Sequence, residues 1–434
     1  MANPVNPPRG MRDFLPADKA RREHALGIIK GVYRSHGFDE IETPVVEDYS
    51  RLHAGLGGDN EKLSFSILKR GISADALAAA AESGNAEQLA DLGLRFDLTV
   101  PLTRFYASHR AELPPVFRSL QIGPVWRAER PQKGRYRQFV QADIDIIGES
   151  GLLAEIELIT ATSQALAALG LEDCVIRVND RRVLFGLLAA CGFDAAVHER
   201  ALITIDKLDK IGASGVVEEL RGIDASAAEK VGEVLASVEP LLQDGIELTG
   251  NAISSSVIGI SNNELAAAGI ASLAELGAAL HGSLPQGVTV QFDPTLVRGM
   301  GYYTGTIFEI AHPGSGSSVG GGGRYDGMVG RFLGQDVPAV GFSIGFERVV
   351  DLIELPAGEG PEAVALVFDR DAEANDLTAL KNELVARGHR VRLERRQKNM
   401  KALLDRVSAE GFTSFANVAA GVRDVDKLEL RSLS

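Results

Sequence analysis

Side chains that can accept hydrogen bonds alternate with apolar ones in the segment 136–147. Gln141, Asp143 and Asp145 occupy every second position there, and Asp97 lies in a similar alternating run. Successive side chains of a strand point to opposite faces, so the three residues share one face. A polar face on an isolated strand ordinarily contacts water. The basic residues nearby favour a binding face instead.

Arginines lie close to these carboxylates in the sequence. Arg127 and Arg130 precede a loop, and three more basic residues lie in and after it: Lys133, Arg135 and Arg137. Carboxylates can accept hydrogen bonds from an ammonium group, while arginines bind oxyanions through two parallel hydrogen bonds. This combination on one sheet would suit a zwitterionic amino acid beside a phosphate.

A second group of residues with chemical potential is LVRGMGYYTG at 296–305. It combines Arg298 with Tyr302 and Tyr303 in a mostly apolar segment. The alternative is that the tyrosines belong to an ordinary strand and the arginine to a turn. The segment alone is compatible with both interpretations.

The run SSVGGGGRYDG at 317–327 contains four adjacent glycines, a composition usual in flexible loops. It lacks the GK[ST] ending of a P-loop and the strand–GxGxxG–helix context of a dinucleotide fold. Four glycines nevertheless permit a ligand to approach the backbone closely.

The segment 338–354 predicts a strand with one face made entirely of small residues, followed by a helix. The small residues are Ala339, Gly341, Ser343 and Gly345. A flat ligand could lie against such a face. Arg348 falls in the first turn of the helix, where the helix dipole disfavours a cation by roughly 0.3–1 kcal/mol unless a phosphate or a stacked base compensates. The alternative is an i,i+3 ion pair with Asp351, worth only a few tenths of a kcal/mol.

The elements that would position these residues form an antiparallel sheet with flanking helices, an α/β (α+β) fold. Mixed three- and four-residue spacing predicts a helix over 18–35, and alternation predicts a half-buried strand over 94–100. Segments 116–129 and 136–147 predict strands joined by the loop RPQKGR, which is long enough for an antiparallel hairpin. Further strands are predicted over 288–346.

Two regions differ from this sheet in pattern. The Ala-rich stretch 180–283 is helical and carries little visible chemistry, so it is interpreted as an insertion. The run LPAGEGPE contains a linker at 356–361, and strand–helix–strand–helix spacing after it predicts a small α/β domain over 362–434. The sheet domain is therefore discontinuous and comprises 1–179 and 284–355.

Composition places the chain among globular proteins. Of 434 residues, 45% are hydrophobic and 24% charged, enough for two or three domains with filled cores. The N-terminus has no apolar signal-like stretch and the uncharged stretches are too short to span a bilayer, which predicts a cytoplasmic protein with no membrane partner. Cys174 and Cys191 lie in apolar surroundings without metal-ligand spacing, so both are interpreted as core residues and no metal ligands are assigned.

Net charge restricts where nucleic acid could bind. With 45 basic against 59 acidic residues, the chain as a whole repels a polyanion. The segment 387–406 is an exception, since it holds eight basic and two acidic residues. Most charge runs are solvated faces, but a patch of this density would also suit contacts with RNA phosphates.

These segments, in this order, resemble the class II aminoacyl-tRNA synthetases and the histidyl-tRNA synthetase family in particular. The three class II motifs are matched by GFDEIETPVVED at 37–48, WRAERPQKGRYRQFVQADIDIIG at 126–148 and GFSIGFERV at 341–349. LVRGMGYYTG and GGGGRYDG are similar to the family's two histidine-specific signatures. The combined match is far more specific than one short motif.

The resemblance implies a histidine site and an ATP site. The histidine-binding residues would be Asp97, Gln141, Asp145, Tyr303 and Tyr325, and the ATP-binding residues Arg127, Arg298 and Arg348, with Arg127 and Arg298 catalytic. Asp97 and Gln141 would hold the ammonium group. Asp145 and Tyr303 would read the imidazole from opposite sides, with Tyr325 lining the pocket. Arg127 would bind the α-phosphate, Arg298 this phosphate and the histidine carboxylate, and Arg348 would lie over adenine.

The implied activity is activation of L-histidine with ATP, assisted by Mg²⁺, and transfer of histidine to tRNA(His). The resemblance also implies a homodimer through the segment containing Pro44 and an anticodon-binding role for the C-terminal domain. That domain is abbreviated, because the chain ends soon after the strand-like run KLELRSLS. A second departure is Gly301, which stands where many family members carry aspartate.

Two other functions are compatible with the resemblance. One is a non-catalytic paralogue that regulates the ATP phosphoribosyltransferase of histidine biosynthesis. Such proteins typically lack the C-terminal domain and lose catalytic positions, whereas Arg127, Arg298 and Arg348 are present here. The other is an enzyme that makes the adenylate but transfers it to an acceptor other than tRNA, an alternative that Gly301 and the short C-terminal domain keep open.

Overall fold

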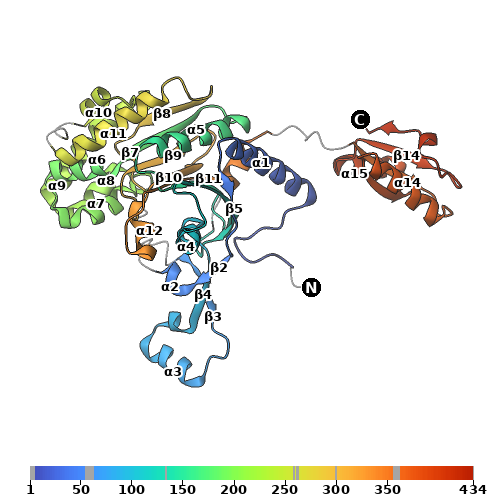
Figure 1. Ribbon diagram of the computed structural model, residues 1–434, viewed down its shortest axis with the longest axis horizontal. Helices are drawn as coiled ribbons and strands as arrows, with labels where there is room; N and C mark the ends of the chain where they lie inside the picture. The colour runs from blue at the N-terminus through green and yellow to red at the C-terminus, as the bar shows by residue number, and fades with distance from the viewer. Residues whose placement is uncertain are drawn as a thin grey trace. The chain divides into compact units, whose positions relative to one another are not determined.

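The computed structural model describes residues 5–53, 63–131, 134–257, 260, 263–298, 301–354 and 362–433. The chain forms two compact units (Figure 1). The first comprises residues 1–12 and 26–354, and the second residues 13–25 and 355–434. The linker predicted at 356–361 lies outside the described residues.

An eight-stranded sheet forms the centre of the first unit, in the order β1-β5-β6-β11-β10-β9-β7-β8 (Figure 1). The strands are β1 (Asp39–Glu40), β5 (Phe117–Trp126), β6 (Gln138–Ile147), β11 (Ala339–Gly345), β10 (Gly320–Arg324), β9 (Thr306–Ala311), β7 (Cys174–Asp180) and β8 (Val288–Phe292). All neighbours pair antiparallel except the two edge pairs, β1 with β5 and β7 with β8. The predicted class of an antiparallel sheet flanked by helices is confirmed.

The hairpin of β5 and β6 places the polar positions of β6. Its register pairs Trp126 with Gln138 and Phe117 with Ile147, so the two strands match along their full length. Ala142, Ile144 and Ile146 are fully buried on one face of β6, and helix α5 (Leu153–Ala168) packs against β6, β11 and β8. The opposite face of β6 is thereby left to line a cavity.

The prediction of a strand over 94–100 is wrong. The strand β4 (Ala90–Leu94) ends where the alternation begins, and helix α4 (Thr99–His109) starts five residues later. Pro101 falls in the first turn of α4, where its missing N–H costs no hydrogen bond. The Asp97 carboxylate accepts a hydrogen bond from the Val100 N–H at 3.1 Å, which stabilises this helix start.

Smaller elements lie next to this part of the chain. A three-stranded sheet has the order β2-β4-β3. Its outer strands are β2 (Val46–Asp48) and β3 (Phe65–Leu68), and it is accompanied by α2 (Tyr49–Leu52), α3 (Ala74–Ser83) and the 3-10 turn η2 (Ala86–Leu89). The helix α12 (Asp326–Leu333) follows β10, and α13 (Phe346–Leu352) follows β11.

Among the described residues between β7 and β8 there are six helices, in the Ala-rich stretch that the sequence predicts to be helical (Figure 1). They are α6 (Arg181–Cys191), α7 (His198–Ile205), α8 (Leu208–Arg221), α9 (Ala225–Asp244), α10 (Gly250–Ser256) and α11 (Glu264–Leu280), with the 3-10 turn η3 (Ala195–Val197) before α7. Side-chain caps mark the starts of α6, α9, α10 and α11, because Asp180, Asp224, Thr249 and Asn263 accept hydrogen bonds from first-turn N–H groups. Cys174 and Cys191 are buried free thiols.

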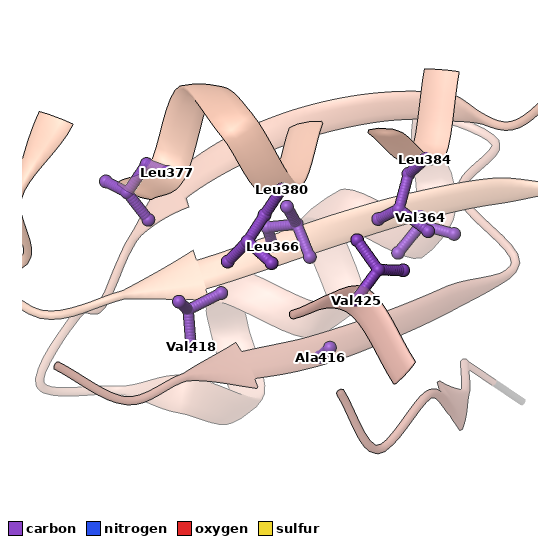
Figure 2. Packing of buried hydrophobic residues seen from close by; sticks show 8 residues of the cluster. All are labelled: Val364, Leu366, Leu377, Leu380, Leu384, Ala416, Val418 and Val425. Atoms are coloured by element: carbon purple, nitrogen blue, oxygen red, sulfur yellow. The ribbon is translucent and has the colours of Figure 1, made fainter. Parts of the chain in front are cut away.

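The second unit contains a four-stranded sheet in the order β13-β12-β14-β15. Its strands are β12 (Ala363–Phe368), β13 (Arg390–Arg395), β14 (Ser414–Val418) and β15 (Arg431–Ser432), and the other elements are α14 (Ala374–Ala386), α15 (Met400–Ala409) and η5 (Val425–Lys427). Residues of β12 alternate between two cores. Val364 and Leu366 pack with Leu380 of α14 (Figure 2), whereas Ala365 packs with Leu403 of α15. Pairing is parallel for β12 with β13 and β14 and antiparallel for β14 with β15, so a mostly parallel sheet covered on both faces results.

The N-terminal helix α1 (Pro16–Ser35) completes the described elements. No helix in the described part of the chain is both long enough and apolar enough to cross a lipid bilayer.

Candidate active site

A cavity of about 1040 Å³ opens on the polar face of the central sheet. All eight residues assigned from the sequence line it: Asp97, Arg127, Gln141, Asp145, Arg298, Tyr303, Tyr325 and Arg348. They come from the β4–α4 connection, the β5–β6 hairpin, the loops before β9 and after β10, and α13. Segments separated by up to 251 positions in the sequence, from Asp97 to Arg348, therefore contribute to one pocket.

Two of the sequence patterns meet in register across the sheet. Gln141, Asp143 and Asp145 of β6 stand directly opposite Gly345, Ser343 and Gly341 of β11, respectively. A Cβ atom on Gly341 would lie 2.0 Å from Asp145 Oδ1, so only glycine fits beside this carboxylate. The small-residue face of β11 thus makes room for the polar face of β6.

The floor of the pocket holds three buried acceptors that have no hydrogen-bond partner among the described residues. They are Asp97 Oδ2, Gln141 Oε1 and Asp143 Oδ1. Buried acceptors are rarely left without a donor, so this group marks a place for a ligand that carries several N–H donors. An ammonium group meets that requirement.

Burial controls the protonation of the pocket carboxylates. Asp97 and Asp145 are 2% and 3% exposed, and burial raises the pKa of Asp97 to about 6 and that of Asp145 to about 7. The Tyr325 hydroxyl donates to Asp145 Oδ1 at 2.6 Å, which opposes part of the rise in the pKa of Asp145. Burial also raises the pKa of Asp143, and the charge of Asp145 adds to this rise.

Replacing Asp145 with asparagine should make the ligand-free protein more resistant to heat at high pH. Between the ordinary pKa of 3.8 and about 7, folded Asp145 keeps a proton that the unfolded chain has released. Its ionisation therefore costs stability as pH rises through this window, by a few kcal/mol at most. The melting temperature of the variant relative to wild type should increase between about pH 5 and about pH 8. A difference that stays constant over this range would contradict the assignment.

The three arginines are held by the protein in different ways. Arg127 Nε donates to the Phe96 carbonyl at 3.0 Å, next to Asp97. Arg298 Nη1 donates to Glu309 Oε2 at 2.9 Å. Arg348 donates to the backbone carbonyls of Ser318 and Gly134, the latter at 3.4 Å. All three guanidinium groups reach the same cavity from different walls.

The glycine-rich run 320–323 is part of a strand, inside the range 288–346 where strands are predicted, and is not the flexible loop that such a composition usually forms. It forms most of β10, between β9 and β11. A Cβ on Gly322 would lie 1.9 Å from the Gly341 carbonyl oxygen, and a Cβ on Gly321 would lie 2.8 Å from Arg298 Cζ. The glycines therefore allow close strand packing and leave room for the Arg298 side chain. The tight packing explains why this composition forms a strand.

Sequence reasoning missed several pocket residues. Asp143 was placed on the correct face without a role, although its alternation with Gln141 and Asp145 is the signal that identifies it. Arg177 lies between apolar residues of β7, and Glu309 is the single charged residue of β9, a weaker signal that was not used.

The helices between β7 and β8 also reach the pocket. Asp206, Lys207 and Lys210 from the α7–α8 region line it. Burial raises the pKa of Asp206, and the positive charge of Arg298 opposes this rise. Nothing in the local sequence around Asp206 indicated that these residues would lie near Arg298.

Gly301 lines the cavity and is exposed. A Cβ added there would meet no atom of the described structure within 4 Å. The aspartate that many family members carry at this position is therefore not excluded here by lack of space.

A family model described as histidyl-tRNA synthetase matches residues 10–349. The chain belongs to the histidyl-tRNA synthetase family. A histidine–tRNA ligase of Leifsonia xyli subsp. xyli is 67% identical over 435 residues, which cover 100% of both chains. A probable histidine–tRNA ligase of Tropheryma whipplei is 43% identical and covers 95% of each chain. These matches confirm the resemblance on which the histidyl-tRNA synthetase assignment rests.

Solved structures share the synthetase fold. Histidyl-tRNA synthetase from Nostoc sp. PCC 7120 aligns with a TM-score of 0.75 and 26% identity, covering 100% of this chain and 95% of that one. A second structure, described as an ATP phosphoribosyltransferase regulatory subunit/histidyl-tRNA synthetase from Bacillus halodurans, has a TM-score of 0.74 and covers 97% and 99%. At 21% identity, this second similarity shows the fold alone.

Proposed function

We propose that this chain is a histidine–tRNA ligase that converts L-histidine and ATP to histidyl-adenylate and then transfers histidine to tRNA(His). The observation that carries the proposal is the pocket itself. Buried acceptors for an ammonium group and arginines for phosphates line one cavity, in a chain that matches a histidine–tRNA ligase along its whole length.

Activation begins with the orientation of two negatively charged groups, the histidine carboxylate and the α-phosphate of ATP. Asp97 and Gln141 hold the histidine ammonium, and the histidine carboxylate then attacks the α-phosphorus of ATP in line. A new carboxyl–phosphorus bond forms as the bond to pyrophosphate breaks. Arg127 and Arg298 stabilise the charge on the α-phosphate, so catalysis consists of positioning and electrostatic stabilisation. In the second step a terminal ribose hydroxyl of tRNA attacks the carbonyl carbon and AMP leaves.

Selectivity for histidine comes from hydrogen bonds to both imidazole nitrogens. Asp145 and Tyr303 contact the ring from opposite sides, and Tyr325 fixes Asp145 through its 2.6 Å hydrogen bond. A site that reads polar atoms in this way can reject an apolar analogue by roughly 10⁴-fold, because its own buried groups would be left unpaired.

Mg²⁺ would accompany ATP. The described residues contain no group of three or more His, Cys, Asp or Glu side chains suited to a metal ion. Nucleotide-bound Mg²⁺ commonly takes phosphates, waters and only one or two carboxylates, so such a group is not required. Glu129 lines the pocket and would supply such a carboxylate. The ion would neutralise phosphate charge.

Two assays on the full chain test the function. Histidine-dependent exchange of pyrophosphate into ATP measures adenylate formation, and charging of tRNA(His) measures the transfer. Activity in both is the expected result. No exchange would favour a non-catalytic regulatory role, and exchange without charging would favour a different acceptor.

The proposal includes a homodimer formed through the segment around Pro44, in the cytoplasm. Pro44 and Val45 are exposed, Val45 at 40%. Obligate dimers usually bury roughly 2,000 Å² or more, so the pair should persist at micromolar concentration. Light scattering should therefore give twice the mass of the chain.

A charge on the proposed dimer surface should separate the subunits. Val45→Arg would place a cation in the contact, while Leu153→Arg, at a 52% exposed position of α5, is the matched control. The first variant should be monomeric and the second dimeric. A monomeric wild-type protein would exclude the dimer.

A further inference from the structure

A series of ion pairs between four side chains connects Arg298 to the central sheet. Arg298 Nη1 donates to Glu309 Oε2 at 2.9 Å, and Arg177 donates to the other oxygen of Glu309. Arg177 Nη1 also donates to Asp293 Oδ2 at 3.2 Å. The order of contacts is therefore Arg298, Glu309, Arg177 and Asp293.

Hydrogen bonds fix Asp293, the residue at the other end of this series of ion pairs. Asp293 is 1% exposed, and its Oδ1 accepts from the backbone N–H and the hydroxyl of Thr295 at 2.8 and 2.6 Å. Its own N–H donates to the Val178 carbonyl at 3.0 Å. Glu309 on β9 and Arg177 on β7 are direct cross-strand partners. These two side chains consequently share the rigidity of the sheet.

Arg298 itself does not belong to the sheet. It lies between β8 and β9, and the described residues of this connection, 293–298 and 301–305, form no helix or strand. Its guanidinium group lies over Gly321, the residue of β10 that pairs with Glu309 on one side and Ser343 on the other. The ion pair with Glu309 is thus the contact that directs this side chain over the sheet.

We propose that Glu309 and Arg177 are positioning residues that hold the Arg298 guanidinium where the α-phosphate reacts. The inference rests on the proposed function. Glu309 orients the guanidinium group of Arg298, because its own carboxylate is held in place before ATP binds. Arg177 donates a hydrogen bond to the second carboxylate oxygen of Glu309. Its positive charge therefore reduces the repulsion between Glu309 and the phosphates of ATP. An arginine held in advance loses less conformational freedom when the transition state forms.

Glu309→Gln tests this role, since it keeps the shape but removes the charge that holds two arginines. We expect kcat for histidine-dependent pyrophosphate exchange to fall roughly 10- to 100-fold, because a misplacement of about 1 Å can cost on the order of 100-fold. KM for histidine should change by less than about threefold, because the ammonium-binding acceptors remain in place. Glu157→Gln is the matched control: Glu157 pairs with Arg118 through two hydrogen bonds of 2.6 and 2.7 Å, and neither residue lines the pocket.

A double-mutant cycle with Arg298→Ala decides whether Glu309 acts through Arg298. If it does, adding Glu309→Gln to Arg298→Ala should change the residual exchange rate by less than about twofold, because coupled residues are not additive. Independent, additive losses would overturn the proposal. So would recovery of the Glu309→Gln variant at high Mg²⁺, because that result would make Glu309 a metal ligand.

Protein stability has to be separated from positioning. Melting temperature and calorimetric histidine binding should show that Glu309→Gln is folded. If it is not, Arg177→Lys replaces it in the same cycle, because lysine keeps the charge but cannot bond Glu309 and Asp293 through one planar fork. If the wild-type protein exchanges pyrophosphate and the Glu309→Gln variant exchanges it equally fast, only this inference is overturned. If the wild-type protein does not exchange pyrophosphate, the proposed function is overturned.

Discussion

Replacing Arg298 with alanine should reduce histidine-dependent pyrophosphate exchange by roughly 100- to 1000-fold, the loss seen when one preorganised donor to a transition-state oxyanion is removed. The main partner of this guanidinium is the charge that develops at the α-phosphate. Histidine binding should be weakened but still measurable by calorimetry, because Asp97, Gln141 and Asp145 remain. The loss should therefore appear mainly in kcat.

Arg118→Ala is the matched control for this variant. Arg118 is a partly buried arginine on β5 of the central sheet. It pairs with Glu157 and does not line the pocket. It should exchange pyrophosphate near the wild-type rate. An Arg298→Ala variant that exchanges as well as Arg118→Ala would show that Arg298 has been given the wrong role.

The polar face of β6 could be predicted from the sequence because it depends on a local rule. Alternation along a strand places Gln141, Asp143 and Asp145 together whatever the rest of the chain does. What alternation could not indicate is their burial. Asp143 is only 4% exposed because β11 lies beside it and because the pocket walls come from distant segments.

The same rule failed over 95–98, where contacts with distant parts of the chain bury both the polar and the apolar side chains. Arg95, Phe96, Asp97 and Leu98 alternate in polarity, yet all four are buried and none lies in a strand. Arg95 is 4% exposed because it donates to the Thr43 and Pro44 carbonyls as well as to Pro124. These partners are at least 29 positions away in the sequence, so tertiary contacts override the pattern.

The contribution of the helices between β7 and β8 is a further limit of sequence reasoning. Their caps and apolar spacing are local, but the position of Lys207 and Lys210 beside the cavity depends on how α7 and α8 pack. The link between Arg177 and Glu309 likewise appears only once strand order is known, because the two residues are 132 positions apart in the sequence and meet only through the pairing of β7 with β9.

The basic segment 387–406 is less available to RNA than its charge suggests. Four of its arginines form ion pairs within the second unit: Arg387 with Glu383 and Asp426, Arg392 with Glu394 and Glu410, Arg396 with Asp369, and Arg406 with Glu394 and Glu410. Arg395, Lys398 and Lys401 are exposed and form no ion pair among the described residues. They lie at the end of β13 and the start of α15.

Replacing Arg395, Lys398 and Lys401 together with alanine should therefore raise KM for tRNA(His) by about tenfold or more at low salt, because each can neutralise one phosphate. Pyrophosphate exchange should not change, since these residues lie outside the pocket. Loss of three phosphate contacts should also lower the slope of log KM against log salt concentration by roughly two. The difference from wild type should accordingly shrink as salt increases.

The paired arginines provide the control for this experiment. Arg387→Ala with Arg406→Ala removes cations of similar exposure, at 42% and 44%, whose charge is already matched by carboxylates. Its effect on KM for tRNA should be smaller than that of the triple variant, and its salt dependence should remain close to wild type. If the triple variant charged tRNA(His) with unchanged KM and salt dependence, this surface would not contact the RNA. The proposed anticodon role of the second unit would then have lost its electrostatic basis, and a non-tRNA acceptor would become the stronger hypothesis.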